Sequence, residues 1–124
     1  MKATLHEKKL ILFGPDRLTN GKPIAELKSV IVAAVENNYL DIVIDLSRTQ
    51  YIDSSGIGEL VASFTTLRNR GGSLCLNRLT PKARDFLLMT KLLNVLISFD
   101  VDYSSHRIVD IDGNNLSELK KLQS

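Results

Sequence analysis

Two adjacent serines, Ser54 and Ser55, carry the hydroxyl groups best placed for chemistry in this chain. They belong to residues 53–58, Asp-Ser-Ser-Gly-Ile-Gly, where an extended apolar segment passes into a helical pattern. A hydroxyl group at such a turn can cap the helix, serve as a nucleophile beside a base, or accept a phosphoryl group. Capping is the most frequent role, because Ser, Asp and Gly dominate caps and turns for local reasons. The turn is therefore a candidate site whose role depends on the residues around it.

The spacing around the serines does not fit a hydrolase. A nucleophile elbow has glycine two residues before and two residues after its serine. Ile52 stands two residues before Ser54, and Ile57 stands two residues after Ser55. The two histidines of the chain lie near opposite ends of the sequence, and surface or capping roles are far more common for histidine than a place in a triad.

Nucleotide and metal motifs also fail on spacing. Six residues separate Gly14 from Gly21, where a phosphate loop has four, and the Gly-x-Gly of the serine turn lacks the third glycine of a dinucleotide fingerprint. Asp45 and Asp53 lack the second acidic residue and the lysine that an aspartyl-phosphate site needs, so caps and turn hydrogen bonds are favoured for both. We expect no catalytic residue, no metal ion and no cofactor.

The residues on either side of the serines predict a strand and a helix. Residues 42–46, Ile-Val-Ile-Asp-Leu, form a continuous run typical of a strand covered on both faces. After the turn, apolar residues recur at three and four positions, which predicts an amphipathic helix from about 55 to 69. Asp53 and Ser54 are its N-cap candidates. The inner stripe of this helix is expected to comprise Ile57, Leu60, Val61, Phe64 and Leu67.

The alternation of strand and helix continues along the chain. Further strands are expected at residues 3–6, 9–13, 73–77 and 95–99, and further helices from Pro23 to about Asn37 and from Pro81 onward. The inward residues of the helix after Pro81 should be Ala83, Phe86, Leu87 and Leu93. This order predicts an α/β fold, an open mixed or mostly parallel sheet of four to five strands with helices packed against it. Its core should also include Ile31, Ile44 and Leu74.

The C-terminal part of the sequence has a weaker pattern. Residues 104–111 fit either a short helix or an extended segment. Residues 115–118, Asn-Leu-Ser-Glu, resemble a capping box, which predicts an extra C-terminal helix over about 115–122 packed on the domain.

The composition is that of one globular domain spanning residues 1–124, because 124 residues with 44% hydrophobic content suffice for one core. The 16 basic and 14 acidic residues are interspersed, which disfavours a nucleic acid partner. No apolar run approaches the ~20 residues of a membrane span, and the N-terminus lacks a signal-peptide core, so a cytoplasmic protein is expected. The single cysteine, Cys75, is expected on a buried strand as a small hydrophobe.

Four stretches carry a resemblance to a known family. They are residues 42–47, residues 51–58 with Tyr-Ile-Asp-Ser-Ser-Gly-Ile-Gly, residues 71–76, and the pair Thr80 and Pro81. Together they resemble the STAS domain of bacterial anti-sigma factor antagonists. In that family the serine directly after the aspartate is the phosphoacceptor, which corresponds to Ser54 here. The resemblance makes Asp53, Ser55, Gly56 and Gly58 the residues of the turn around it.

This chain departs from the family pattern at two places. The loop between Gly14 and Pro23 is a few residues longer than usual, and the acidic residue of that loop corresponds to Asp16. Lys91 stands where many relatives have glycine.

The resemblance implies a switch that acts through protein binding. The unphosphorylated chain would bind an anti-sigma factor, a serine kinase that uses ATP, and so free a sigma factor for transcription. Phosphorylation of Ser54 would release the kinase, and a serine phosphatase would reset the switch. Small or polar residues on the serine helix allow close approach by a partner, although a plain solvated face is equally compatible with the sequence. The partner surface is expected to include Asp16, Glu59, Ala62 and Ser63.

Two other classes of function remain open at this point. One is a non-catalytic STAS scaffold in another assembly, such as a stress complex or a lipid-transport accessory. The other is a small enzyme or ligand-binding domain, which would present a deep polar pocket with convergent titratable groups.

Overall fold

A five-stranded mixed sheet forms the centre of the fold, as the computed structural model shows for residues 1–90 and 102–123, the part of the chain it describes. The strands are β1 (Lys2–His6), β2 (Lys9–Phe13), β4 (Asp41–Asp45), β6 (Ser73–Asn77) and β7 (Val109–Asp110). Their spatial order is β6-β4-β2-β1-β7. β2, β4 and β6 run parallel, whereas β1 is antiparallel to both of its neighbours. The predicted α/β fold with an open mixed sheet is confirmed.

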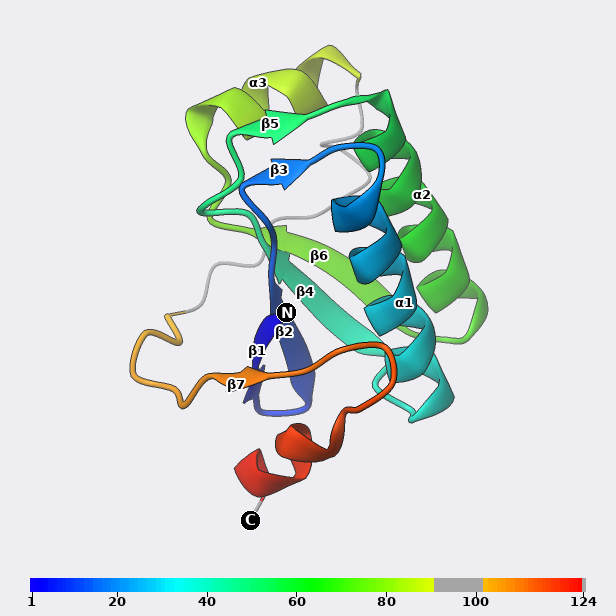
Figure 1. Ribbon diagram of the computed structural model, residues 1–124, viewed down its shortest axis with the longest axis vertical. Helices are drawn as coiled ribbons and strands as arrows, with labels where there is room; N and C mark the ends of the chain where they lie inside the picture. The colour runs from blue at the N-terminus through cyan, green and yellow to red at the C-terminus, as the bar shows by residue number, and fades with distance from the viewer. Residues whose placement is uncertain (91–101, 124) are drawn as a thin grey trace.

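Two helices cover one face of this sheet. α1 (Lys22–Glu36) and α2 (Ser54–Asn69) lie side by side against it (Figure 1). Because successive side chains of a strand point to opposite faces, alternate strand residues meet the helices. These are Leu10, Leu12, Ile42, Ile44, Leu74 and Leu76, all buried in the main core. Leu27, Ile31 and Ala34 of α1 are buried in the same core, which confirms the expected core position of Ile31.

The opposite face of the sheet carries a smaller core. Ile11 and Val43 pack there with Tyr103, and Phe13 and Cys75 lie against them. Tyr103 comes from the segment before β7 and is 2% exposed. Among the described residues, the aromatic side chain of Tyr103, from a distant part of the sequence, therefore covers apolar residues of this face.

A second, two-stranded sheet lies near the start of α2. β3 (Arg17–Leu18) pairs in parallel with β5 (Tyr51–Ile52), and α3 (Pro81–Met89) lies beside them (Figure 1). Thr80 caps α3 by accepting from the backbone N–H of Ala83, and its hydroxyl donates to the carbonyl oxygen of Thr49 at 2.7 Å. The sequence analysis did not anticipate this sheet, which holds the loops around the serine turn together.

Several expected core positions proved wrong in detail. Val61 and Phe86 are 38% and 37% exposed, so neither belongs to the inner stripe of its helix. Ile57 and Phe64 are half-buried and pack on the edge of the core, whereas Leu60 and Leu67 are fully buried as expected. The expected strand at 95–99, Leu93 and Lys91 lie outside the described residues.

The C-terminal part adopts extended structure followed by a tight helix. Residues 109 and 110 form β7, which answers the open question for residues 104–111 in favour of an extended segment. The predicted C-terminal helix is a 3₁₀-helix, η2 (Ser117–Leu122), and the side chain of Asn115 accepts from the backbone N–H of Ser117 at 2.9 Å. Leu119 is buried, so the element packs on the domain as expected.

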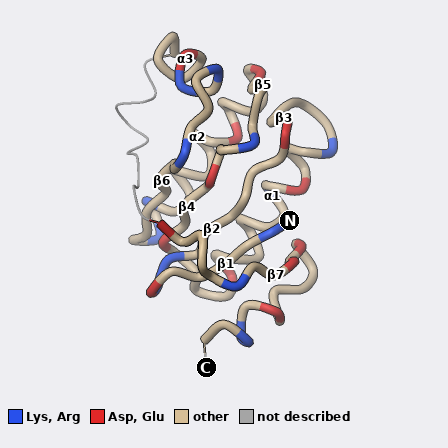
Figure 2. Tube along the Cα trace, turned by 90° about the vertical axis from the view of Figure 1, so that its left-hand side faces the viewer, with Lys and Arg blue, Asp and Glu red and all other residues tan. Residues whose placement is uncertain are grey.

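Charge and hydropathy are mixed over the described residues. Figure 2 shows Lys and Arg interspersed with Asp and Glu along the trace. Among residues 1–90 and 102–123, none of the helices has the length and apolar character needed to cross a bilayer.

Candidate functional site

Asp53 organises the turn that carries the two serines. It has an extended backbone and is the N-cap of α2, with its Oδ1 accepting from the N–H of Gly56 at 2.8 Å. Its Oδ2 accepts from the N–H of Asn20 at 3.0 Å, which ties the turn to the loop after β3. The N–H of Asn20, and after it that of Gly56, lowers the pKa of Asp53 below its ordinary value. Asp53 is therefore an ionised carboxylate at neutral pH, and its predicted capping role is confirmed.

Ser54 and Ser55 are the first two residues of α2, and both side chains are exposed. Of the two N-cap candidates, Asp53 occupies the position and Ser54 is the first helical residue. Ser54 thus has a solvent-accessible hydroxyl at the positive end of the helix dipole, where an anion is stabilised. The first turn of α2 contains no acidic residue. The nearest negative charge to Ser54 along the sequence is therefore the carboxylate of Asp53, the preceding residue.

The two glycines of the turn have different structural roles. A Cβ atom on Gly56 would lie 2.1 Å from the carbonyl oxygen of Leu18, so only glycine lets α2 begin this close to β3. A Cβ atom on Gly58 would meet no heavy atom within 4 Å. Gly56 is therefore required by packing, whereas Gly58 leaves an open patch on the outer face of α2.

The expected partner surface is only partly exposed. Asp16 and Ala62 are exposed, and Glu59 is half-buried. Ser63 is 2% exposed and its hydroxyl donates to Oε2 of Glu59 at 3.0 Å, so the prediction that it faces a partner is wrong. Ser63 is buried because α1 packs along that side of α2, where a shallow groove of about 80 Å³ is bordered by Lys28, Val32, Glu59, Ala62 and Thr66.

The loop of Asp16 is held next to the serine turn. The carbonyl oxygen of Asp16 accepts from the N–H of Gln50 at 2.8 Å. The hydroxyl of Thr49 donates to the carbonyl oxygen of Pro15 at 2.6 Å. With the pairing of β3 and β5, these bonds fix the longer loop 14–23 against the segment that leads to Ser54.

A cationic and aromatic cluster beside the turn was missed by the sequence analysis. The guanidinium carbon of Arg17 lies 4.4 Å from the ring centroid of Tyr51, and Nζ of Lys82 lies 5.3 Å from the same centroid. Tyr51 is 50% exposed and lies two residues before Asp53. The three residues come from β3, β5 and α3, so only the unexpected pairing of β3 with β5 could have revealed the cluster.

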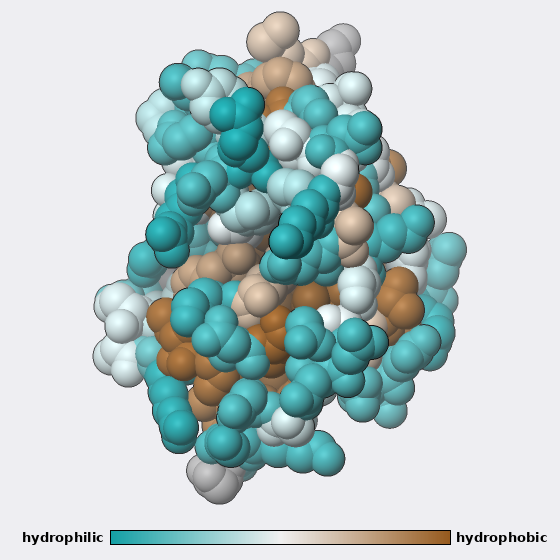
Figure 3. Space-filling model, in the orientation of Figure 1, coloured by the Kyte–Doolittle hydropathy of each residue, from teal (hydrophilic) through white to brown (hydrophobic). Residues whose placement is uncertain are grey.

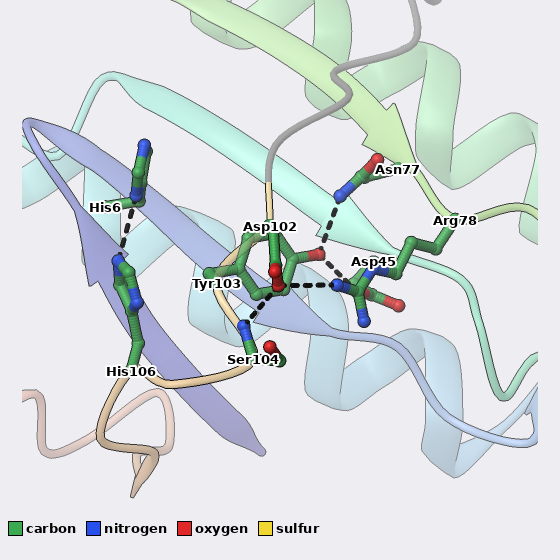
Figure 4. Close-up of polar contacts among 8 residues, drawn as sticks. All are labelled: His6, Asp45, Asn77, Arg78, Asp102, Tyr103, Ser104 and His106. Carbon is green, nitrogen blue, oxygen red and sulfur yellow. Dashed lines mark hydrogen bonds and ion pairs between the residues drawn. The ribbon is translucent and has the colours of Figure 1, made fainter.

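The histidine, cysteine and carboxylate side chains of the described residues are the candidate ligands for a metal site. No group of three or more His, Cys, Asp or Glu side chains is arranged to hold a metal ion among those residues. The two histidines contact each other, with Nδ1 of His6 at 2.9 Å from Nε2 of His106 (Figure 4). Burial raises the pKa of the Cys75 thiol, which disfavours its reactive thiolate form.

Comparison with known proteins places the chain in a family. Residues 22–106 match the model of the STAS domain. The chain belongs to the STAS domain family. A comparison with curated proteins gave no match.

Solved structures share the STAS fold. A crystal structure of a candidate anti-sigma factor antagonist of Thermotoga maritima is 22% identical, with a TM-score of 0.71 over 83% of this chain and 88% of that one. The anti-sigma factor antagonist SpoIIAA in its unphosphorylated form is 17% identical, with a TM-score of 0.61 over 85% of this chain and 91% of that one. The phosphorylated form of SpoIIAA, from Bacillus, gives the same identity and TM-score over 85% of this chain and 95% of that one. At these identities the likeness concerns the fold.

Proposed function

We propose that this STAS domain is an anti-sigma factor antagonist that is switched by phosphorylation of Ser54. The observation that carries the proposal is the exposed hydroxyl of Ser54 on the first turn of α2, directly after the capping Asp53. The fold shared with SpoIIAA, whose structures include an unphosphorylated and a phosphorylated form, supports the same assignment.

Phosphorylation at this place should change the surface and leave the fold intact. A phosphoserine adds about −1.5 to −2 charges and three acceptor oxygens, and the N-terminal end of a helix stabilises such an anion. Because Ser54 is exposed, the phosphoryl group needs no space inside the domain. Beside the ionised Asp53 it would concentrate negative charge on the turn.

The proposed partner of the unphosphorylated form is an anti-sigma factor that is also an ATP-using serine kinase. Its contact surface would extend from the serine turn over Gly58, Glu59 and Ala62 of α2 and over the loop of Asp16. A phosphoryl group at Ser54 would weaken that complex by like-charge repulsion and by the cost of desolvating the added charge. In this scheme the chain itself catalyses nothing, a serine phosphatase restores the hydroxyl, and the sigma factor is regulated through the kinase.

Phosphoryl transfer provides the first test. The chain is incubated with Mg·ATP and each anti-sigma kinase encoded in the same genome, and the product is examined by intact-mass and phosphopeptide analysis. We expect one phosphate on Ser54, its loss in Ser54→Ala, and its retention in the matched control Ser55→Ala. Label on Ser55, or no label with any of the kinases, would contradict the proposal.

Binding provides the second test. Calorimetric titration of the kinase should give equal affinities for the unmodified chain and Ser54→Ala, because alanine removes only a hydroxyl group. Ser54→Asp should bind at least about tenfold more weakly, since like-charge juxtaposition at an interface costs more than about 1.4 kcal/mol. Equal affinities for Ser54→Asp and the unmodified chain would instead favour a STAS scaffold that stays bound whatever the state of Ser54.

A further inference from the structure

An open hollow of about 480 Å³ lies where β2 and β4 end. It is lined by Lys2, Phe13, Ser47, Arg48 and Ile108. Phe13 is the last residue of β2, and Ser47 and Arg48 follow β4. In open α/β sheets, ligands bind outside the carboxyl ends of the parallel strands. The hollow has that position and shares no residue with the serine turn.

The apolar wall of the hollow packs against a buried hydrogen-bond network. Phe13 packs edge-on against Tyr103, with ring centroids 5.8 Å apart and an interplanar angle of 76°. The hydroxyl of Tyr103 donates to the buried carboxylate of Asp45 and accepts from Nδ2 of Asn77 at 2.9 Å (Figure 4). This network fixes the tyrosine ring, which in turn fixes the ring of Phe13.

The rest of the apolar wall is open to solvent. Ile108 is 49% exposed, although it is a large aliphatic residue. Figure 3 shows hydrophobic surface over the lower half of the molecule, where β1 and β7 lie, interrupted by hydrophilic side chains. An apolar ligand body in the hollow would remove Phe13 and Ile108 from water, which is favourable in proportion to the area covered.

Two cations flank this apolar wall, and they differ in how they are balanced. Nζ of Lys2 lies 3.0 Å from a carboxylate oxygen of Asp110, in a pair that is exposed on both sides. Arg48 is exposed and forms no ion pair within residues 1–90 and 102–123. Ser47 adds a hydroxyl group beside it, on a backbone held by the bond from its N–H to Oδ1 of Asp45 at 2.8 Å. Within the part of the chain that the structure describes, the hollow therefore offers one positive charge without an ion-pair partner, next to an apolar surface.

We propose that the hollow binds a small amphipathic monoanion, a carboxylate attached to an apolar body. The carboxylate contacts the guanidinium group of Arg48, whose planar fork matches a carboxylate with two parallel hydrogen bonds. The apolar body lies against Phe13 and Ile108. A monoanion fits better than a phosphate dianion, because Asp110 already balances Lys2. Pockets of this volume, mainly apolar with a few placed polar groups, are typical of small-molecule sites.

The test uses nuclear magnetic resonance titration of the full chain with three probes. Octanoate carries both the charge and the apolar body, acetate carries the charge alone, and octan-1-ol carries the apolar body alone. We expect saturable shifts of the amides of Phe13, Ser47 and Ile108 with octanoate, and binding weaker by roughly tenfold or more with each of the other two probes. Octanoate that leaves these amides unshifted, or octan-1-ol that binds as tightly as octanoate, would overturn the proposal.

Substitutions then locate the head group and the apolar body. Arg48→Gln should weaken octanoate binding by roughly tenfold, whereas the matched control Arg70→Gln, at the end of α2, should leave it unchanged. Ile108→Ser should weaken octanoate binding without unfolding the chain, because the side chain is 49% exposed. Ser54→Ala should bind octanoate as the unmodified chain does, which separates this site from the proposed switch. Unchanged octanoate affinity in Arg48→Gln would overturn the proposal.

Discussion

The two faces of the central sheet are closed by different means. The face under α1 and α2 is covered by many aliphatic side chains from two helices. On the opposite face, within residues 1–90 and 102–123, Tyr103 packs against Ile11 and Val43 and also forms hydrogen bonds with the buried side chains of Asp45 and Asn77. In aliphatic packing, each of many contacts contributes a small part of the free energy of folding. In a buried hydrogen-bond network, the loss of one partner leaves another polar group unpaired, which costs much more. Substitutions that remove side-chain volume should therefore destabilise the helix-covered face most. On the opposite face, substitutions that remove a polar atom should have the larger effect.

The largest loss of stability should come from a cavity on the helix-covered face. Leu60→Ala removes a fully buried side chain of α2 and should lower the free energy of unfolding by about 2–5 kcal/mol. Urea unfolding measures the loss. The adjacent control Val61→Ala, at a position 38% exposed, should cost less than about 1 kcal/mol. If the two variants lost similar free energies of unfolding, α2 would have to present a different side to the sheet from the one described.

On the opposite face, Tyr103→Phe keeps the ring and removes only the hydroxyl group. Asp45 and Asn77 would each lose a hydrogen bond while remaining buried, which should cost about 1–3 kcal/mol. The same urea measurement applies, with Tyr51→Phe as the matched control, because Tyr51 is 50% exposed. A loss no greater than that of the control would remove the distinction between the two faces.

Alkaline pH should weaken the second face selectively. Burial, and after it the hydrogen bond to Asp45, raises the pKa of Tyr103 above its ordinary value of 10. The unfolded chain then releases the tyrosine proton at a lower pH than the folded chain does. The contribution of Tyr103 is therefore complete below about pH 10 and declines as pH rises toward the higher pKa of the folded state. The unfolding free energies of the unmodified chain and of Tyr103→Phe should therefore converge above about pH 10. A difference that stays constant with pH would contradict the raised pKa of Tyr103 in the folded chain.

The smallest effect is expected on the outer surface of α2, which belongs to neither face. Gly58→Ala adds a methyl group that meets no heavy atom within 4 Å, and alanine favours the helix, so stability should rise by about 0.5–1 kcal/mol. Thermal unfolding would detect the gain. Gly56→Ala is the contrasting variant, because its methyl group would clash with the carbonyl of Leu18 and lower stability.

The sequence predicted best what local patterns determine. The parallel strands are continuous apolar runs, α1 shows a clear helical period, and Asp53 lies at a turn whose capping chemistry is local. The position of the serine turn at the start of α2 therefore follows from the sequence alone. Val61 and Phe86 were misplaced because each lies at the border of its helical stripe, where only neighbouring elements decide which side is covered.

Features that depend on distant residues could not be predicted in the same way. β3 and β5 have two residues each, too few to show a period, and they are 33 or more residues apart in the chain. Tyr103 meets Asp45 across a separation of 58 residues and Asn77 across 26, so no local pattern connects them. Ser63 has a polar side chain on a helix, yet it is buried because α1 packs beside it.

Tyr103 also gives the domain an internal spectroscopic reporter. The chain has no tryptophan and three tyrosines, so tyrosine contributes much of its near-ultraviolet circular dichroism. That signal depends on aromatic side chains held in fixed surroundings. Tyr103 is 2% exposed, whereas Tyr51 is half-exposed and Tyr39 is only partly buried. A near-ultraviolet signal that disappears before the far-ultraviolet helical signal would thus show the tyrosine-covered face opening while α1 and α2 remain folded.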